Sequence, residues 1–322
     1  RQDHLRFAVP VQVAQRRGGH QLAGDAQGRG LALAVDAIRL ARLPHGEDLR
    51  PHVAVGVAHH HAELDALVQV DGEAAQRFAL AVDRVDLLVT GAGDGIGKMA
   101  AIEYAKHGAT VILLDKTLPK IEKVYDEIEE AGYPQAAIIP MDLQTANPDE
   151  YQALHDVIEK EFGHLDGILH NASQFKLLSR IDDYDIETWF QVMQINLNAP
   201  FIITQHCLPL LRKSKSASLI FTSDCVGRKS KAYWGAYGVS KFGIEGLMQI
   251  LALELENSAI RVNSIDPGPT RTNFRHLAYP GEDKMSVKPV EKLAPLYLWL
   301  MGDDSSAING QAISYEEQTS VH

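Results

Sequence analysis

A glycine-rich segment between an apolar run and a helix-like run is the feature that most constrains how this chain can fold. Residues 87–89 are Leu, Leu and Val, residues 90–97 read TGAGDGIG, and helix-like residues follow as far as His107. Glycines let a backbone approach a pyrophosphate closely, and the free N–H groups at a helix start point toward its negative charge. The spacing G-x3-G-x-G departs from the usual G-x-G-x-x-G pattern. Taken alone, the segment therefore indicates a dinucleotide site no more strongly than a tight turn.

From Asp86 onward, strand-like and helix-like segments alternate. The strand-like segments are 87–90, 110–114, 136–140, 165–170, 218–222, 261–266 and 311–314. The helix-like segments are 97–107, 119–131, 149–162, 186–212, 234–256 and 290–302. Buried apolar strands that alternate with amphipathic helices predict an α/β fold, a doubly wound parallel sheet (Rossmann fold) covered on both faces. We therefore expect residues 86–322 to form a single domain that binds its ligand beyond the carboxyl ends of the strands.

Residues 1–85 differ in composition from the rest of the chain. They contain ten Arg and no Lys, and they lack Ser, Thr, Asn, Tyr, Cys, Met and Trp. Apart from Phe7, Ile38 and Phe78, every residue type there can be encoded by codons that begin with G or C. We interpret this segment as an N-terminal extension, non-native or disordered, translated from GC-rich DNA in an antisense or shifted frame. The alternative is a small Ala/Val/Leu-rich domain.

The overall composition argues against several classes of protein. A net charge of -11 disfavours a nucleic-acid-binding surface, and no run approaches the 18 or so apolar residues of a membrane span. The two cysteines, Cys207 and Cys225, predict no disulfide framework and fit a reducing compartment. The N-terminus lacks a basic region followed by an apolar stretch. We therefore expect a cytoplasmic protein with no nucleic-acid or membrane partner.

Acidic residues follow two of the predicted strands. Asp115 comes about 20 residues after the glycine segment, where a carboxylate can hydrogen-bond the ribose hydroxyls of a dinucleotide. It would repel a 2′-phosphate, which favours NAD over NADP, although Lys116 could partly neutralise it. Asp142 follows the third strand-like segment, where it could meet the adenine ring. Both aspartates could instead be simple helix caps.

A tyrosine and a lysine stand four residues apart in the helix-like stretch 234–256. Tyr237 and Lys241 would lie on one face of that helix. A nearby ammonium favours a phenolate, so we expect Lys241 to lower the pKa of Tyr237 toward the range useful for proton transfer at neutral pH. Such pairs are common on helix surfaces. This one follows the fifth strand of a predicted dinucleotide fold, which favours a functional role.

Taken in order, these motifs resemble the classical short-chain dehydrogenase/reductase family over residues 86–322. The resemblance is carried by the glycine segment, Asp142, Asn171-Ala172, Asn196, Tyr237-x3-Lys241 and the run PGPTRT at 267–272. It implies that the tyrosine is the general acid/base, that the lysine binds the nicotinamide ribose, and that the asparagine holds a proton-relay water. It also implies an oxidoreductase that transfers a hydride between NAD(H), with NADP(H) second, and a small or medium alcohol/ketone. A homodimer or homotetramer is the expected assembly.

The predicted site residues fall into two groups, and no metal is expected. The catalytic group is Asn196, Ser223, Asp224, Tyr237 and Lys241. The cofactor-binding group is Gly91, Gly93, Asp94, Gly95, Ile96, Gly97, Asp115, Asp142, Leu143, Asn171, Ala172, Tyr237, Lys241, Pro267, Gly268, Thr270 and Thr272. We expect residues 174–180, 225–234 and 270–288 to hold the substrate.

One catalytic position departs from the family pattern. The resemblance implies a serine thirteen residues before the tyrosine, and that position is Asp224. A serine hydroxyl donates a hydrogen bond as negative charge develops on the substrate oxygen, whereas an ionised aspartate only accepts one and would repel that charge. Ser223 would point to the opposite face of a regular strand, so it could serve only if the strand end is bulged or turned. The departure leaves open an alternative function, a catalytically weakened dinucleotide-binding protein that acts as a sensor or interaction module.

Overall fold

The computed structural model describes residues 85–315. The predicted N-terminal extension lies outside the described residues, apart from Val85, which opens the first strand. The strands are β1 (Val85–Thr90), β2 (Ala109–Asp115), β3 (Ala137–Pro140), β4 (Gly167–His170), β5 (Ala217–Thr222), β6 (Ile260–Asp266) and β7 (Ala312–Ser314). The α-helices are α1 (Gly95–Lys106), α2 (Leu118–Glu130), α3 (Pro148–Glu161), α4 (Ile186–Met193), α5 (Ala199–Leu211), α6 (Gly235–Glu254), α7 (Asn273–Ala278) and α8 (Ala294–Met301). Short helices are the π-helix η2 (Gln194–Asn198) and the 3-10 helices η3 (Cys225–Gly227), η4 (Lys284–Ser286), η5 (Val290–Leu293) and η6 (Asp303–Ser305).

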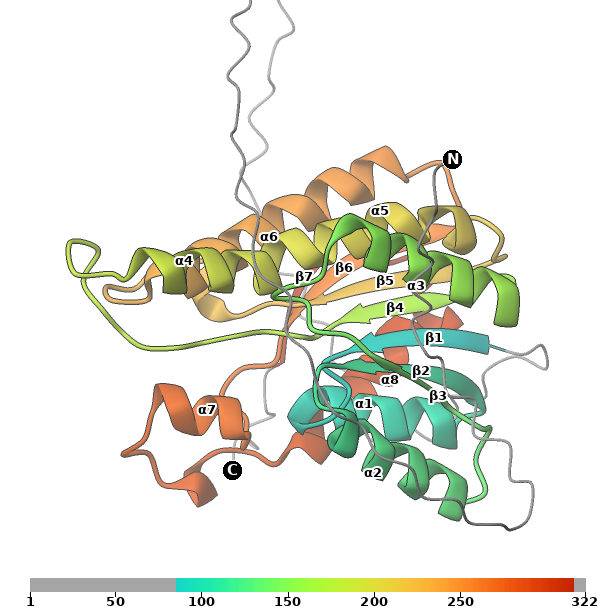
Figure 1. Cartoon of the computed structure of the whole chain (residues 1–322), viewed down its shortest axis with the longest axis horizontal. Helices are drawn as coiled ribbons and strands as arrows, with labels where there is room; N and C mark the ends of the chain where they lie inside the picture. The colour runs from blue at the N-terminus through green and yellow to red at the C-terminus, as the bar shows by residue number, and fades with distance from the viewer. Residues whose placement is uncertain (1–84, 316–322) are drawn as a thin grey trace, which may run out of the picture. The chain divides into compact units, whose positions relative to one another are not determined.

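The strands form one parallel sheet in the order β3-β2-β1-β4-β5-β6-β7. Helices α1, α2 and α8 pack on one face, and α3, α5 and α6 pack on the other (Figure 1). The chain winds outward in both directions from the neighbouring strands β1 and β4. Such a switch point leaves a crevice at the carboxyl ends of the strands. The predicted doubly wound parallel sheet is confirmed.

Burial on both faces explains the unbroken apolar sequences of the strands. Residues 87–89 and 111–114 are fully buried. On α2, in contrast, Ile121, Val124 and Ile128 recur every three or four residues and are fully buried, while the residues between them are mostly polar and exposed. Unbroken apolar runs therefore mark the buried strands, and apolar residues spaced three or four apart mark the helices that cover the sheet.

Three segments differ from the prediction. The single helix expected over 186–212 is divided by η2, because Pro200 has no N–H to donate to the carbonyl group of Asn196, which weakens the α-helical pattern there. The helix expected over 290–302 is divided into η5 and α8. Helix α7 was not predicted. Thr272 begins it by accepting a hydrogen bond from the N–H of Arg275 at 3.0 Å.

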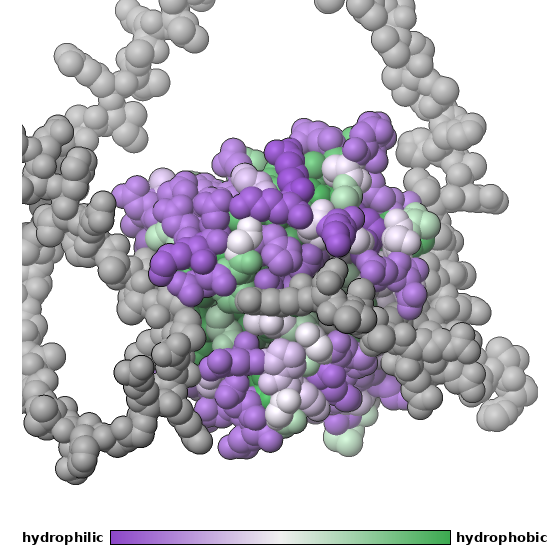
Figure 2. Space-filling view, turned by 90° about the vertical axis from the view of Figure 1, so that its right-hand side faces the viewer, coloured by the Kyte–Doolittle hydropathy of each residue, from purple (hydrophilic) through white to green (hydrophobic). Residues whose placement is uncertain are grey.

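The face at the amino ends of the strands is mostly hydrophilic. Figure 2 shows it from the right-hand side of Figure 1, and polar side chains predominate among the described residues visible there, with small apolar areas between them. The glycine segment opens on the other side. Within residues 85–315, no helix is long and apolar enough to cross a membrane.

Candidate active site

A cavity of about 600 Å³ lies at the carboxyl ends of the strands. It is lined by residues at the ends of β1, β2, β4, β5 and β6, at the start of α6 and in α7. In the described part of the chain, no group of three or more His, Cys, Asp or Glu is arranged to hold a metal ion. The cavity therefore lies where the sequence predicted a ligand site.

The glycine segment is shaped by positions that accept only glycine. Gly91 has a φ of 66° and lines the cavity, and a Cβ there would lie 2.9 Å from the Cα of Ala172. A Cβ at Gly97 would overlap the carbonyl oxygen of Gly91 and lie 2.6 Å from the Nδ2 of Asn171. Gly97 is thus a packing position behind the turn, whereas Gly91 presents bare backbone to the cavity.

Asp94 joins the glycine segment to α2 and α7. Its carboxylate accepts a hydrogen bond from the N–H of Gly95 at 2.8 Å and so caps α1. It also accepts from Lys120 Nζ at 2.8 Å and from Asn273 Nδ2 at 3.0 Å. Burial alone would raise the pKa of Asp94, but these hydrogen bonds and the Lys120 charge outweigh it and hold the pKa below its ordinary value.

Asp115 braces the glycine segment from β2. It lines the cavity, and its Oδ2 accepts a hydrogen bond from the N–H of Gly93 at 3.2 Å. Its Oδ1 accepts from the N–H of Thr117 at 2.9 Å. Both carboxylate oxygens are therefore engaged by backbone, which the predicted ribose contact did not foresee. Lys120, the partner of Asp94, brings an ammonium to the same end of the cavity.

Thr90 fixes the end of β4 beside the glycine segment. Its hydroxyl oxygen accepts hydrogen bonds from the N–H groups of Asn171 at 3.0 Å and Ala172 at 3.1 Å. Asn171 Nδ2 donates in turn to the carbonyl oxygen of Gly91 at 3.4 Å. The predicted residues Asn171 and Ala172 therefore reach the cavity wall because a β1 side chain holds them there.

The structure does not bring Asp142 and Leu143 to the cavity. Asp142 is exposed, and its Oδ1 accepts a hydrogen bond from the N–H of Gln144 at 3.0 Å, so it closes a local turn after β3. Leu143 is 5% exposed and belongs to the core beside α3. Asp142 therefore closes a turn and does not cap a helix, and its contact with adenine stays a prediction.

Tyr237 is hydrogen-bonded to Asp224. Its hydroxyl donates a hydrogen bond to Asp224 Oδ2 at 3.0 Å, while Asp224 Oδ1 accepts from the N–H of Val226 at 3.0 Å. Burial raises the pKa of Tyr237 well above its ordinary value, and the charge and hydrogen bond of Asp224 raise it further. The predicted lowering of this pKa by Lys241 is therefore wrong, because a buried phenol that donates to a carboxylate loses its proton less readily.

Lys241 is buried below Tyr237. Its Nζ donates a hydrogen bond to the carbonyl oxygen of Thr222 at 2.7 Å and lies 5.5 Å from the centre of the Tyr237 ring. Burial lowers the pKa of Lys241 to about 8, although Asp224, Glu245 and Asp266 each act to raise it. The lysine is thus anchored by a backbone carbonyl group, and burial makes its ammonium form less stable.

Asp266, at the end of β6, is a lining residue that the sequence analysis missed. It accepts a hydrogen bond from the N–H of Gly268 at 2.8 Å. Burial raises its pKa, and the neighbouring charge of Asp224 raises it further, against the effects of Gly268, Arg228 and Lys288. The strand-end position that drew attention to Asp115 would have identified Asp266 as well.

The structure distinguishes Asp224 from Ser223. Ser223 follows the last residue of β5, and its N–H donates to the carbonyl oxygen of Ile265 at 2.7 Å. Its hydroxyl is buried, with no hydrogen-bond partner among the described residues. Of the two candidates, Asp224 contacts Tyr237, although both residues line the cavity.

Asn196 lies behind the cavity wall. It is 2% exposed within η2, and its Oδ1 accepts a hydrogen bond from the N–H of Gln174 at 2.7 Å. Its Nδ2 donates to the carbonyl oxygen of Gln174 at 3.0 Å and to Ser240 Oγ at 3.1 Å. Asn196 therefore ties the segment after β4 to α6, where the π-helical turn presents it, and its role in proton relay stays a prediction.

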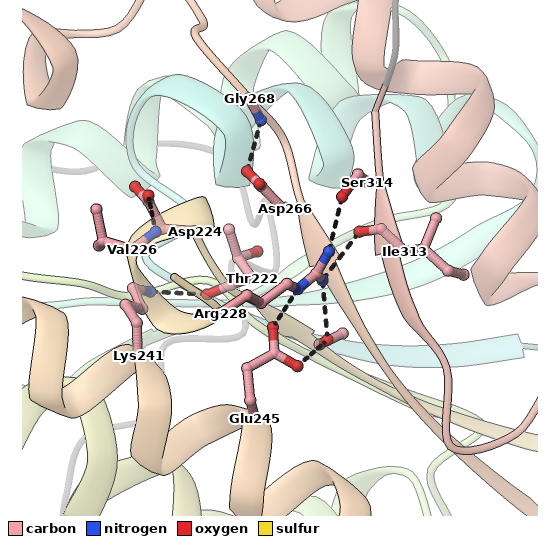
Figure 3. A network of polar contacts seen from close by, with 11 residues as sticks. Thr222, Asp224, Val226, Arg228, Lys241, Glu245, Asp266, Gly268, Ile313 and Ser314 are labelled. Carbon is pink, nitrogen blue, oxygen red and sulfur yellow. Dashed lines mark hydrogen bonds and ion pairs between the residues drawn. The ribbon is translucent and has the colours of Figure 1, made fainter. Parts of the chain in front are cut away.

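Arg228 ties η3 to α6, β6 and β7 (Figure 3). Its Nε pairs with Glu245 Oε1 at 3.0 Å, and its other nitrogens donate to Ser314 Oγ at 2.7 Å and to the carbonyl oxygen of Ile313 at 3.1 Å. Ser264 Oγ donates to Glu245 Oε2 at 2.7 Å and completes the network. The guanidinium of Arg228 is thus directed away from Asp224, and it fixes η3, the short helix that follows Asp224.

Aromatic rings form the wall next to Tyr237. Trp234 and Phe274 have ring centres 5.5 Å and 5.4 Å from that of Tyr237, and Tyr279 lies 6.0 Å from Trp234. All three line the cavity, as predicted for segments 225–234 and 270–288. Segment 174–180 does not line it, because Phe175 packs into the buried ring cluster instead.

The cavity gathers most of the predicted site residues. Those that line it are Gly91, Asp94, Gly95, Ile96, Asp115, Asn171, Ala172, Ser223, Asp224, Tyr237, Lys241, Pro267, Gly268, Thr270 and Thr272. Those that do not are Gly93, Gly97, Asp142, Leu143 and Asn196. Lining residues absent from the prediction include Thr222, Asp266 and Ser314.

Comparison with known proteins gives one consistent result. The family model described as short chain dehydrogenase matches residues 86–283. The uncharacterized oxidoreductase YciK of Escherichia coli (strain K12) is 46% identical over 228 residues, which are 71% of this chain and 90% of that protein. A Pseudomonas syringae structure assigned to the short chain dehydrogenases is 49% identical, with a TM-score of 0.72, and the match covers 73% of this chain and 96% of that chain. A Shigella flexneri 2a structure with the same assignment, complexed with NADP, is 47% identical, with a TM-score of 0.70 and coverage of 74% and 99%.

Proposed function

This chain belongs to the short chain dehydrogenase family, and on that premise we propose that it is a nicotinamide-dependent oxidoreductase that interconverts an alcohol and a ketone. The proposal is supported above all by the convergence of Tyr237 and Lys241 on the cavity that the glycine segment also lines. A group able to move a proton therefore shares one cavity with a segment suited to a pyrophosphate. The aromatic wall favours a small or medium substrate with apolar parts.

The residues present fit a dinucleotide. Gly91 leaves bare backbone at the cavity wall, where a Cβ would collide with Ala172, and Gly95 and Ile96 begin α1 beside it. These groups would hold the pyrophosphate. Thr270 and Thr272 line the cavity together with Tyr237 and Lys241, and would hold the nicotinamide end.

We propose NADP(H) as the preferred cofactor, in place of the NAD(H) that Asp115 suggested. The Shigella flexneri relative is complexed with NADP. In this chain both oxygens of Asp115 already accept backbone hydrogen bonds, and Lys120 lies at the same end of the cavity. A 2′-phosphate would meet the ammonium of Lys120, with the exposed Lys116 close in sequence. Recognition of the NAD ribose by Asp115 is the competing arrangement.

Tyr237 is the proposed proton donor and acceptor. When bound, the nicotinamide supplies a hydride to the substrate carbon or accepts one from it. Tyr237 gives its proton to the substrate oxygen during reduction, or takes one during oxidation. Trp234, Phe274 and Tyr279 line that end of the cavity with aromatic rings. Lys241 would hold the nicotinamide ribose.

A dinucleotide-binding protein without turnover is the second candidate function. It is favoured by one observation, the hydrogen bond from Tyr237 to Asp224, which commits the phenolic proton to a carboxylate. A ketone would then find no free donor, and its developing negative charge would face Asp224. Binding of the dinucleotide would be the output of such a protein.

We also propose that the chain forms a homodimer. Large apolar side chains are exposed on α4, α5 and α6, including Phe190 at 64%, Phe242 at 44% and Leu253 at 70%. A second copy would cover them. Light scattering should give twice the chain mass for the wild type, and Phe242→Lys with Leu253→Lys should shift it toward the monomer. A monomeric wild type contradicts this assembly.

A cytoplasmic location is the expected setting. Cys207 and Cys225 are both unpaired, one buried and one exposed. Unpaired cysteines fit a reducing compartment. Fractionation of cells that make the full chain tests this directly.

The proposed function is tested by cofactor binding followed by turnover. NADPH and NADH are titrated against intrinsic fluorescence, because Trp234 lies in the cavity wall. NADPH should bind more tightly, and its oxidation should depend on a carbonyl substrate from a broad panel. If the wild type and Asp224→Ser both turn over nothing while NADPH binds tightly, the binding-protein alternative is correct.

A further inference from the structure

Asp224 presents a carboxylate to the substrate end of the cavity. It is half-buried, and its backbone is extended as it enters η3. One oxygen is held by the N–H of Val226, and the other accepts the phenolic proton of Tyr237 at 3.0 Å. The carboxylate is therefore fixed in place next to the group that must move a proton.

The cations that line this cavity are occupied elsewhere. Lys241 donates to the carbonyl oxygen of Thr222, and Arg275 pairs with Glu282 at 2.7 Å. Lys231 lies at the exposed rim, with its Nζ 3.8 Å from the Sγ of Cys225. Within residues 85–315, no ion pair joins Asp224 to a cation. A negative group thus faces the substrate with no cation of the described chain within ion-pair distance.

The aromatic wall offers a second, independent feature that suits a cation. Trp234, Phe274 and Tyr279 line the cavity beside Tyr237. Ring faces attract ammonium groups, most strongly when water is excluded. A carboxylate beside aromatic rings is a combination that binds an amine and disfavours an anion.

We propose that the substrate of this site carries an ammonium group on the carbon next to the reacting carbonyl or alcohol carbon. The inference rests on the proposed function and names its substrate class: amino ketones and the matching amino alcohols. The ammonium donates to Asp224 and replaces the hydrogen bond from Tyr237, which frees the phenolic proton for the substrate oxygen. It also cancels the charge that would otherwise oppose the developing oxyanion.

The spacing of the two groups matches such a substrate. The nitrogen and oxygen of an α-amino carbonyl unit lie about 3 Å apart when they face the same way, and the Tyr237 and Asp224 oxygens are 3.0 Å apart. In the reduction, the carbonyl carbon gains a hydride from the reduced nicotinamide, which is oxidised, and the C=O π pair moves to oxygen. That oxygen takes the Tyr237 proton, and solvent restores the phenol.

Binding of two matched alcohols to the full chain, without cofactor, tests the proposal. The probes are 2-amino-1-phenylethanol and 1-phenyl-1-propanol, in which a methyl group replaces the ammonium. Calorimetry at pH 7 should show at least tenfold tighter binding of the amino alcohol to the wild type. Asp224→Asn keeps the shape, removes the charge and should reduce the preference to less than threefold. Asp126→Asn, an exposed position on α2, should leave it unchanged.

The same variants separate failure of this inference from failure of the proposed function. Equal binding of the two probes to the wild type, or a preference that survives in Asp224→Asn, overturns the inference. Oxidation of 2-amino-1-phenylethanol with NADP and reduction of propiophenone with NADPH by Asp224→Ser test the proposed function separately. An Asp224-dependent preference without turnover in either assay overturns the proposed function and leaves the amine site standing. Circular dichroism confirms that both Asp224 variants are folded.

Discussion

The two ends of the cavity are built in different ways. At the glycine-segment end, Asp115 holds the turn through the N–H of Gly93, Thr90 holds the end of β4 through the N–H of Asn171, and a Cβ at Gly97 would collide with backbone. At the proton-transfer end, Tyr237 and Asp224 form one side-chain pair whose protonation depends on charges from several elements. The first end is specified by backbone shape and the second by electrostatics. A sequence motif therefore describes the first end more completely than the second.

Tyr237→Phe gives the largest expected effect and bears on the proton-transfer end alone. Turnover of any substrate should fall about a thousandfold, because general acid/base catalysis contributes factors of this size. The NADPH dissociation constant should stay within twofold, since the glycine-segment end is untouched. Steady-state kinetics and fluorescence titration measure the two quantities. Retention of a tenth of the activity, or a parallel loss of NADPH binding, would contradict the division between the two ends.

Gly97→Ala is the matching change at the glycine-segment end. The new Cβ would overlap the carbonyl oxygen of Gly91, so the turn must shift. We expect about 3 kcal/mol of overpacking strain and about a hundredfold weaker NADPH binding. Gly246→Ala is the control, because a Cβ there meets nothing within 4 Å in α6. It should leave binding unchanged and raise stability by up to about 1 kcal/mol. Similar behaviour of the two variants would show that close packing does not shape this end.

His170 is the last residue of β4 and should make the fold sensitive to acid. Its ring stacks on Phe221 with centres 4.9 Å apart, its Nε2 lies 2.9 Å from Thr204 Oγ1, and burial lowers its pKa to about 3. Below about pH 6.5 the histidine is protonated in the unfolded chain but stays neutral in the folded chain. The free energy of unfolding is therefore highest above that pH and declines as the pH falls toward 3. At pH 5 the loss should be about 2 kcal/mol.

His170→Asn should remove that part of the acid sensitivity. Urea unfolding at pH 7.5 and pH 5 measures it for the wild type, for His170→Asn and for the exposed control His276→Asn. The control should follow the wild type. An equal loss in all three proteins would show that His170 carries no pH dependence.

Lys120→Ala gives the smallest expected effect and sharpens the cofactor proposal. Lys120 lies at the glycine-segment end of the cavity, paired with Asp94 at 2.8 Å. Its removal should weaken NADPH binding about tenfold, or about 1.4 kcal/mol, and leave NADH binding nearly unchanged. Lys123→Ala, another exposed lysine of α2, should alter neither. Equal weakening of NADPH and NADH would assign Lys120 to the pyrophosphate instead of the 2′-phosphate.

Most of the fold followed from local pattern. Unbroken apolar runs placed the strands and a period of 3.6 placed most helices, and the strand ends pointed to Asp115, Asn171 and the 267–272 run. The apolar pattern did not reveal η2, because it continues through Pro200, and the missing N–H of that proline does not by itself specify a π-helical turn. It likewise did not place Asp142, whose side chain finds a backbone partner two residues away.

By itself, the sequence determined the parallel sheet, the glycine segment and the pairing of Tyr237 with Lys241 on one helix, because these follow from short-range spacing. Only the tertiary structure decided that Tyr237 bonds to Asp224, that Lys241 is anchored to Thr222, and that Asn196 lies behind the wall. The physical reason is that a protonation state depends on burial and on every nearby charge. Those charges come from β5, β6, η3 and α6, which the fold alone brings together.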